Sequence, residues 1–171
     1  MTDQLDTNLN QEQPRPGFLT TLCILTFIWT GLSILGSLFS FVSGKQSSEQ
    51  MTATRVELTK QMSEMKELGM DGFADFFEKI ILMSEESNNN FYLGVFVSLV
   101  VVCIGLFSAL KMLKGYKIGF HIYIIYSLLS VGAIYTTVSA ANVPSIIIII
   151  NLILSGLFVF LYSRNLHWLT K

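Results

Sequence analysis

The chain has 171 residues, enough for one soluble domain or for a small bundle of membrane helices. Hydrophobic residues make up 51% and charged residues only 13%, about half of the roughly 25% that soluble domains carry. This composition, with a net charge of −1 and two cysteines, excludes a cytosolic globular enzyme, a nucleic-acid-binding protein and a disulfide-stapled secreted domain.

The charged side chains leave three long gaps, which predict membrane spans. No Asp, Glu, Lys or Arg occurs between Arg15 and Lys45, between Glu86 and Lys111, or between Lys117 and Arg164. A hydrocarbon core of about 30 Å needs about 20 helical residues, and a lone strand would leave backbone polar groups unpaired in lipid. The sequence therefore predicts an all-α integral membrane four-helix bundle, with an extramembrane amphipathic helical segment between helices one and two.

The last gap is too long for one helix, and Asn142 with Pro144 predicts a turn that divides it. The first span could instead be a cleaved signal peptide, although its apolar stretch is about twice the usual length. In chain order we predict a disordered cytoplasmic tail (1–17), transmembrane helix 1 (18–42), an extracytoplasmic amphipathic helical loop (43–90), transmembrane helix 2 (91–110), a basic cytoplasmic loop (111–117), transmembrane helix 3 (118–138), a short outer turn (139–144), transmembrane helix 4 (145–163) and a cytoplasmic tail (164–171).

Lysines in the short loops predict the orientation. Lys111, Lys114 and Lys117 lie in one short loop without an acidic residue, which favours the cytoplasmic side for that loop and for both termini. The inverted topology is the alternative. Four aromatic residues near span ends are expected as interfacial anchors: Tyr116, Tyr123, Tyr162 and Trp168.

Small and polar residues at helical spacing predict the faces on which the spans meet. The first span carries Cys23, Thr26, Thr30, Ser33, Ser37 and Ser40; the second Gly94, Ser98, Gly105 and Ser108; the third Gly119, Tyr126, Ser130, Ala133 and Thr137; the fourth Asn151 and Ser155. The same hydroxyls could instead line a path for a small solute. Packing is favoured, because coupled transporters usually keep a charged residue within their spans and this chain has none there.

The long loop predicts two amphipathic helices, at 48–68 and 72–84, bent at Gly69 and Gly72 and followed by a polar link over 84–90. Their apolar faces could cap the bundle, lie in the membrane interface, or bind a protein partner or a second copy through residues 48–84. Five methionines in the loop could bind copper(I), but Met is also a common gap-filler; they are Met51, Met62, Met65, Met70 and Met83.

Residues capable of chemistry are few. Cys23, Cys103 and His121 could converge as a metal or redox cluster, but they lack metal-binding spacing. The sequence contains no recognisable catalytic motif, so we expect no enzymatic activity, no catalytic or metal site and no cofactor.

Two segments resemble uncharacterised four-span inner-membrane proteins of Bacteroidetes-type bacteria. They are Arg15-Pro-Gly-Phe-Leu-Thr-Thr-Leu-Cys-Ile-Leu-Thr-Phe-Ile28 and Met112-Leu-Lys-Gly-Tyr-Lys-Ile-Gly-Phe120. The resemblance implies a bacterial inner (plasma) membrane and the same topology, and no activity.

Taken together, these patterns favour a structural or interaction protein. It would be surrounded by membrane lipid and would present its outer helical loop to a protein partner or to a second copy. The alternative is a small channel or transporter with a Ser/Thr-lined path.

Overall fold

The computed structural model describes residues 16–171 and contains no strand in that range. Its helices are α1 (Gly17–Ser43), α2 (Ser48–Glu67), α3 (Asp71–Asn89), α4 (Phe91–Leu113), α5 (Lys117–Gly132) and α6 (Ser145–Ser163), with 3₁₀ turns η1 (Ala133–Thr136) and η2 (Ala140–Asn142). Nearly all of the tail expected at 1–17 lies outside the described residues. The all-α fold class is confirmed.

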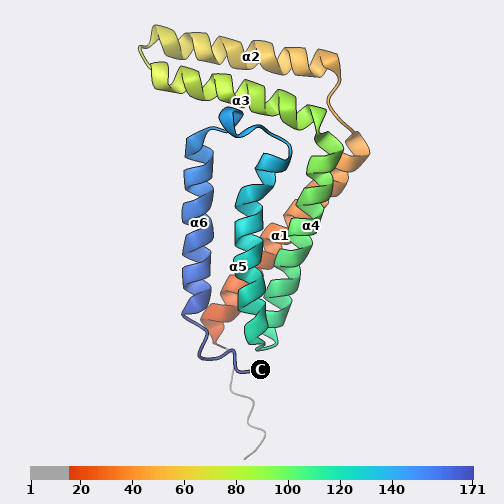
Figure 1. Ribbon diagram of the computed structural model, residues 1–171, viewed down its shortest axis with the longest axis vertical. Helices are drawn as coiled ribbons and strands as arrows, with labels where there is room; N and C mark the ends of the chain where they lie inside the picture. Colours follow the sequence, from red (N-terminus) through yellow and green to blue (C-terminus); the bar gives the residue numbers. More distant parts are fainter. Residues whose placement is uncertain (1–15) are drawn as a thin grey trace, which may run out of the picture.

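Four helices are long and apolar enough to cross a membrane: α1, α4, α5 with its η1 extension, and α6. They stand upright in Figure 1, while α2 and α3 lie across one end of them. At the opposite end are the start of α1, the turn between α4 and α5, and the C-terminal residues. The chain is therefore a multi-pass integral membrane protein with a helical hairpin over one end of its bundle.

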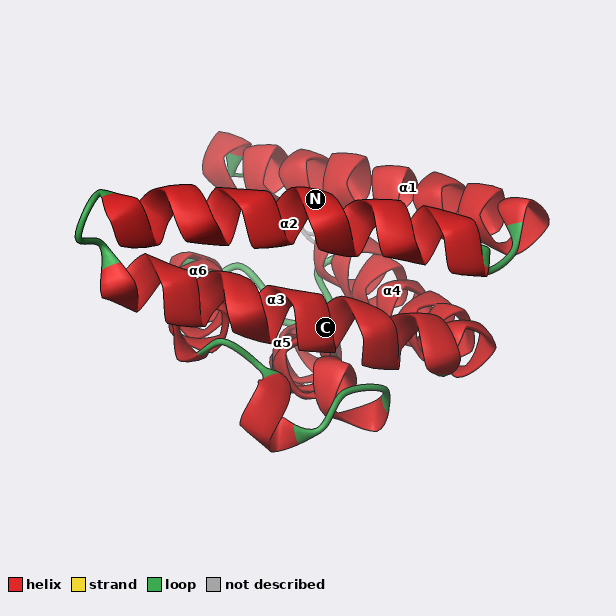
Figure 2. Ribbon diagram, turned by 90° about the horizontal axis from the view of Figure 1, so that it is seen from above, coloured by secondary structure: helices red, strands yellow, loops and turns green. Residues whose placement is uncertain are grey.

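The hairpin consists of α2 and α3, which run side by side in Figure 2. A capping box starts α2: Gln50 N donates to Ser47 Oγ over 3.3 Å, and Ser47 N donates to Gln50 Oε1 over 2.9 Å. Gly69, with φ of 72°, makes the bend, since this backbone conformation suits glycine.

The polar link predicted over 84–90 is wrong, because α3 continues to Asn89. The polar side chains there bind other parts of the chain, which holds this stretch in helical form. Asn88 exchanges two hydrogen bonds with the Gln46 backbone, over 2.8 and 3.2 Å.

Close contact between α4 and α5 forms the centre of the bundle. A Cβ on Gly119 would lie 2.7 Å from Met112 N and 2.9 Å from Ser108 O, both backbone atoms of α4. A Cβ on Gly105 would lie 2.7 Å from the Tyr126 ring. In lipid, where apolar burial no longer drives helices together, such approaches supply the dispersion contacts that associate them.

The predicted seam of α1 is packed most tightly in its first half, where Cys23, Thr26 and Thr30 are buried. In the second half Ser33 and Ser37 are half-buried, and Ser37 Oγ lies 3.4 Å from Ser98 Oγ on the predicted face of α4. Figure 1 shows α1 inclined across the bundle, from the foot of α6 to the top of α4, where the Phe41 and Tyr92 ring centroids are 6.2 Å apart.

Helix α6 packs least. Only 6% of the residues in its apolar stretch are buried, and it contacts mainly α5. The packing role predicted for Asn151 is wrong: its side chain is exposed and donates to Ile147 O of its own helix over 2.8 Å.

Replacing Gly119 with Ala tests the α4–α5 contact. We expect the unfolding free energy in detergent to fall by about 1–3 kcal/mol, because the Met112 and Ser108 backbone atoms have no room to move aside. Gly31→Ala is the matched control: nothing lies within 4 Å of its added Cβ, so stability should stay equal or rise by up to about 1 kcal/mol. Equal losses for both variants would contradict this packing.

Candidate functional site

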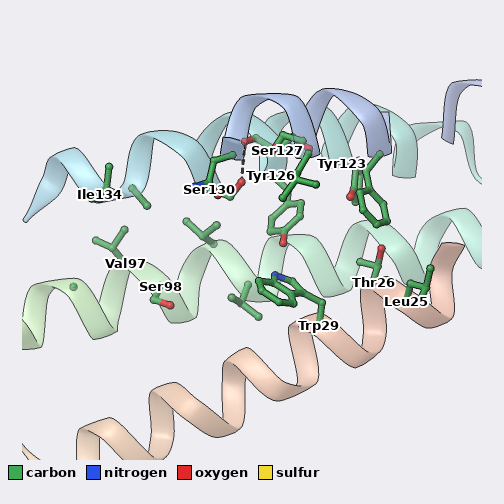
Figure 3. Close-up of a pocket in the computed structure, with 18 of the residues that line it drawn as sticks. Leu25, Thr26, Trp29, Val97, Ser98, Tyr123, Tyr126, Ser127, Ser130 and Ile134 are labelled. Carbon is green, nitrogen blue, oxygen red and sulfur yellow. Dashed lines mark hydrogen bonds between the residues drawn. The ribbon is translucent and has the colours of Figure 1, made fainter. Parts of the chain in front are cut away.

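A crevice of about 690 Å³ lies among the four spans, within the roughly 300–1,000 Å³ typical of ligand sites. It is formed because α1 leans away from α6. Its rim residues Leu25, Trp29 and Leu154 are exposed, and Trp29 shows 67% of its surface, so the crevice opens sideways into the region that lipid occupies. Figure 3 shows how α1, α4 and α5 enclose it.

A buried hydrogen bond closes the crevice toward the termini. Thr26 Oγ1 and Tyr162 Oη are 2.8 Å apart, and the Tyr162 ring is fully buried. The ring centroids of Tyr123 and Tyr162 are 4.5 Å apart. The interfacial-anchor role predicted for Tyr123 and Tyr162 is therefore wrong: the Thr26 hydroxyl gives the phenol of Tyr162 a partner inside the bundle, so these rings pack inward.

The wall contributed by α5 is apolar with a strip of polar groups. Figure 3 shows the rings of Tyr123 and Tyr126 directed from α5 toward α1. Ser127 and Ser130 follow along the same wall, and Ser130 Oγ donates to Ser127 O over 2.9 Å. The crevice can therefore hold an apolar molecule and offer it a few hydrogen bonds on one side.

The hydroxyl stripe predicted on α1 does not form one continuous lining. Thr26 borders the crevice, but Thr30 is fully buried and donates to Thr26 O over 2.8 Å. Ser33 Oγ donates to Trp29 O over 2.8 Å. These two hydroxyl protons are bound to the backbone of their own helix, which leaves less of the stripe available to a solute.

The three residues considered as a metal or redox cluster differ in their surroundings. Cys23 is buried and its Sγ lies 3.8 Å from Ala109 O, whereas Cys103 and His121 are exposed. Within residues 16–171, no three His, Cys, Asp or Glu side chains are grouped as they would be to hold a metal ion.

A second feature with functional potential is the α2–α3 hairpin, which is fixed to the bundle. Glu86 accepts from Asn142 Nδ2 over 2.6 Å and from Ser139 N. Asn90 Nδ2 donates to Thr137 O over 2.9 Å. A carboxylate and an amide thus join the end of α3 to the segment between α5 and α6, which fixes the position of the hairpin.

The tip of the hairpin is apolar and exposed. Leu68 shows 70% of its surface and Phe73 shows 54%, and Met70 between them is also exposed. No residue of α2 is fully buried, although its Leu58, Met62 and Met65 are half-buried. The hairpin therefore presents apolar side chains that the described part of the chain does not cover.

No protein family, curated protein or solved structure matched this chain.

Trp29 reports what fills the crevice, because the chain has only two tryptophans and Trp168→Phe leaves Trp29 alone. In liposomes we expect its fluorescence to be quenched by lipids with brominated acyl chains and to be insensitive to aqueous iodide, since the rim opens toward lipid. Trp29→Phe, which leaves Trp168, is the matched control. Strong iodide quenching of Trp29 would show that water fills the crevice instead.

Proposed function

We propose that this protein is a structural or interaction protein of the membrane rather than an enzyme, and that its α2–α3 hairpin binds a protein partner. The observation that carries the proposal is the apolar tip, formed by Leu68, Met70 and Phe73, on a hairpin fixed to the bundle through Glu86. Exposed apolar side chains on a rigid support are typical of interaction sites.

Charge favours a different protein over a second copy or a lipid surface. The segment from Ser43 to Asn90 contains nine acidic and five basic residues. Two copies meeting through this surface would bring like charges together, and anionic lipid would be repelled. We infer a partner with an apolar patch bordered by basic residues.

We propose the inner (plasma) membrane of a bacterium as the location, with both termini in the cytoplasm. Lys111, Lys114 and Lys117 support this orientation by the preference of short basic loops for the cytoplasmic side. The resemblance of residues 15–28 and 112–120 to uncharacterised four-span proteins of Bacteroidetes-type bacteria supports the location, and membership of that group is part of the proposal.

A second candidate function is a small channel or transporter. The polar strip along the crevice favours it, because Thr26, Ser127 and Ser130 could contact a solute there. The sideways opening suits a solute that enters from the bilayer. Iodide quenching of Trp29 would instead favour an aqueous path.

Substitution of the hairpin tip tests the interaction proposal. We expect Leu68→Glu with Phe73→Glu to remove the partner that co-purifies with the tagged full chain in gentle detergent, because two charges would be placed in an apolar contact. Val56→Glu is the matched control, since Val56 is similarly exposed at 64% but lies on α2 away from the tip. Equal recovery with the tip variant would contradict the proposal, and so would recovery of only a second copy in a two-tag experiment.

Reporter fusions test the orientation. Alkaline phosphatase, which is active only outside the cytoplasm, should be active when fused after Ser47 and inactive when fused after Lys114. Activity at both sites, or at Lys114 alone, would contradict the proposed topology.

A further inference from the structure

The C-terminal residues fold back against the turn between α4 and α5. Lys171 N donates to Gly115 O over 3.1 Å, and Lys117 N donates to Lys171 O over 3.0 Å. Leu169 is only 2% exposed, and the Trp168 ring lies against Gly115. The segment 164–171, expected only as a tail, is thus part of the folded end of the bundle.

Two further cations lie at the same end of the molecule as the three lysines of the turn. Arg164 directly follows the last residue of α6, and the Lys171 backbone is hydrogen-bonded to Lys117 and Gly115. The resulting basic end consists of Lys111, Lys114, Lys117, Arg164 and Lys171. None of the five forms an ion pair within the described residues, and no Asp or Glu follows Glu86 in the sequence.

The lysines of the basic end lie at the ends of apolar spans, and Lys111 is in contact with aromatic rings there. The Lys111 ammonium lies 5.2 Å from the Phe107 ring centroid and 5.1 Å from that of Tyr116, an arrangement that holds its position by cation–π attraction. Lys111 and Lys117 also lie at the ends of the apolar helices α4 and α5. Positive side chains at this depth are at the level of lipid headgroups.

We propose that the basic end binds the headgroups of anionic phospholipids. Clusters of four to eight Lys or Arg next to a membrane helix are typical of anionic-lipid recognition. The turn alone has three lysines, fewer than such a cluster needs. Arg164 and Lys171 of the C-terminal segment raise the number of basic residues to five. The proposal concerns the opposite end of the molecule from the hairpin and does not depend on the partner proposed there.

Lipid titration of the full chain in detergent, read by native mass spectrometry, tests this. Phosphatidylglycerol should bind more tightly than phosphatidylcholine, and added salt should reduce the difference. Two double variants, Arg164→Gln with Lys171→Gln and Lys114→Gln with Lys117→Gln, should each weaken phosphatidylglycerol binding by roughly tenfold or more, since each charge near the surface contributes separately.

The matched control is Lys45→Gln with Lys66→Gln, which removes two exposed lysines near the hairpin and should change the affinity less than about twofold. Equal effects of the control and tail variants would overturn the proposal. If the tail variant fails to fold, the turn variant gives the same test. Sodium phosphate should displace the lipid no better than sodium chloride of equal ionic strength; preferential displacement would indicate a site for free phosphate and overturn the lipid assignment.

Discussion

The close approach of α4 and α5 is the contact on which the rest of the bundle depends. Because lipid solvates apolar side chains as well as another helix does, two spans stay together only where their surfaces fit closely. At Gly119 the α5 backbone lies near the backbone of Met112 and Ser108, and at Gly105 the Tyr126 ring fills the space that a side chain would need. Helix α1 completes this core by packing along α4.

The crevice is the space between α1 and α6 that this core leaves unfilled. The Thr26–Tyr162 hydrogen bond holds α1 and α6 together at one end only, and the inclination of α1 separates them toward the other. A bundle with four parallel spans in full contact would have no such space. The walls of the crevice are apolar with a polar strip, because they consist of side chains that α5 and α6 would bury against α1 in such a bundle.

Much of the architecture was predictable because lipid penalises charge so strongly that gaps between charged residues indicate spans. Contacts between residues far apart in the sequence could not be predicted in this way. Tyr162 was predicted to be an interfacial anchor because its hydrogen-bond partner, Thr26, is 136 positions away and leaves no signal near it in the sequence. The role of Glu86 leaves no local signal in the sequence, since only the fold brings Asn142 and Ser139 to it. Polar residues over 84–90 indicated a loop, because their bonds to distant backbone are invisible in a local pattern.

One residue of the crevice wall did carry a signal in the sequence. Tyr126 could be placed in the bundle because it shares a helical face with Gly119, Ser130 and Ala133. The crevice itself could not be predicted, since it depends on the inclination of α1, a property of the whole assembly and of no short segment.

The weak packing of α6 has a consequence for how the protein is made. Ribosomes deliver a chain from its N-terminus, so α1, α4 and α5 reach the bilayer ahead of α6. These three helices already share most of the interhelical contacts. The last helix joins an assembly that is largely formed, and its Tyr162 supplies the polar contact by which it docks.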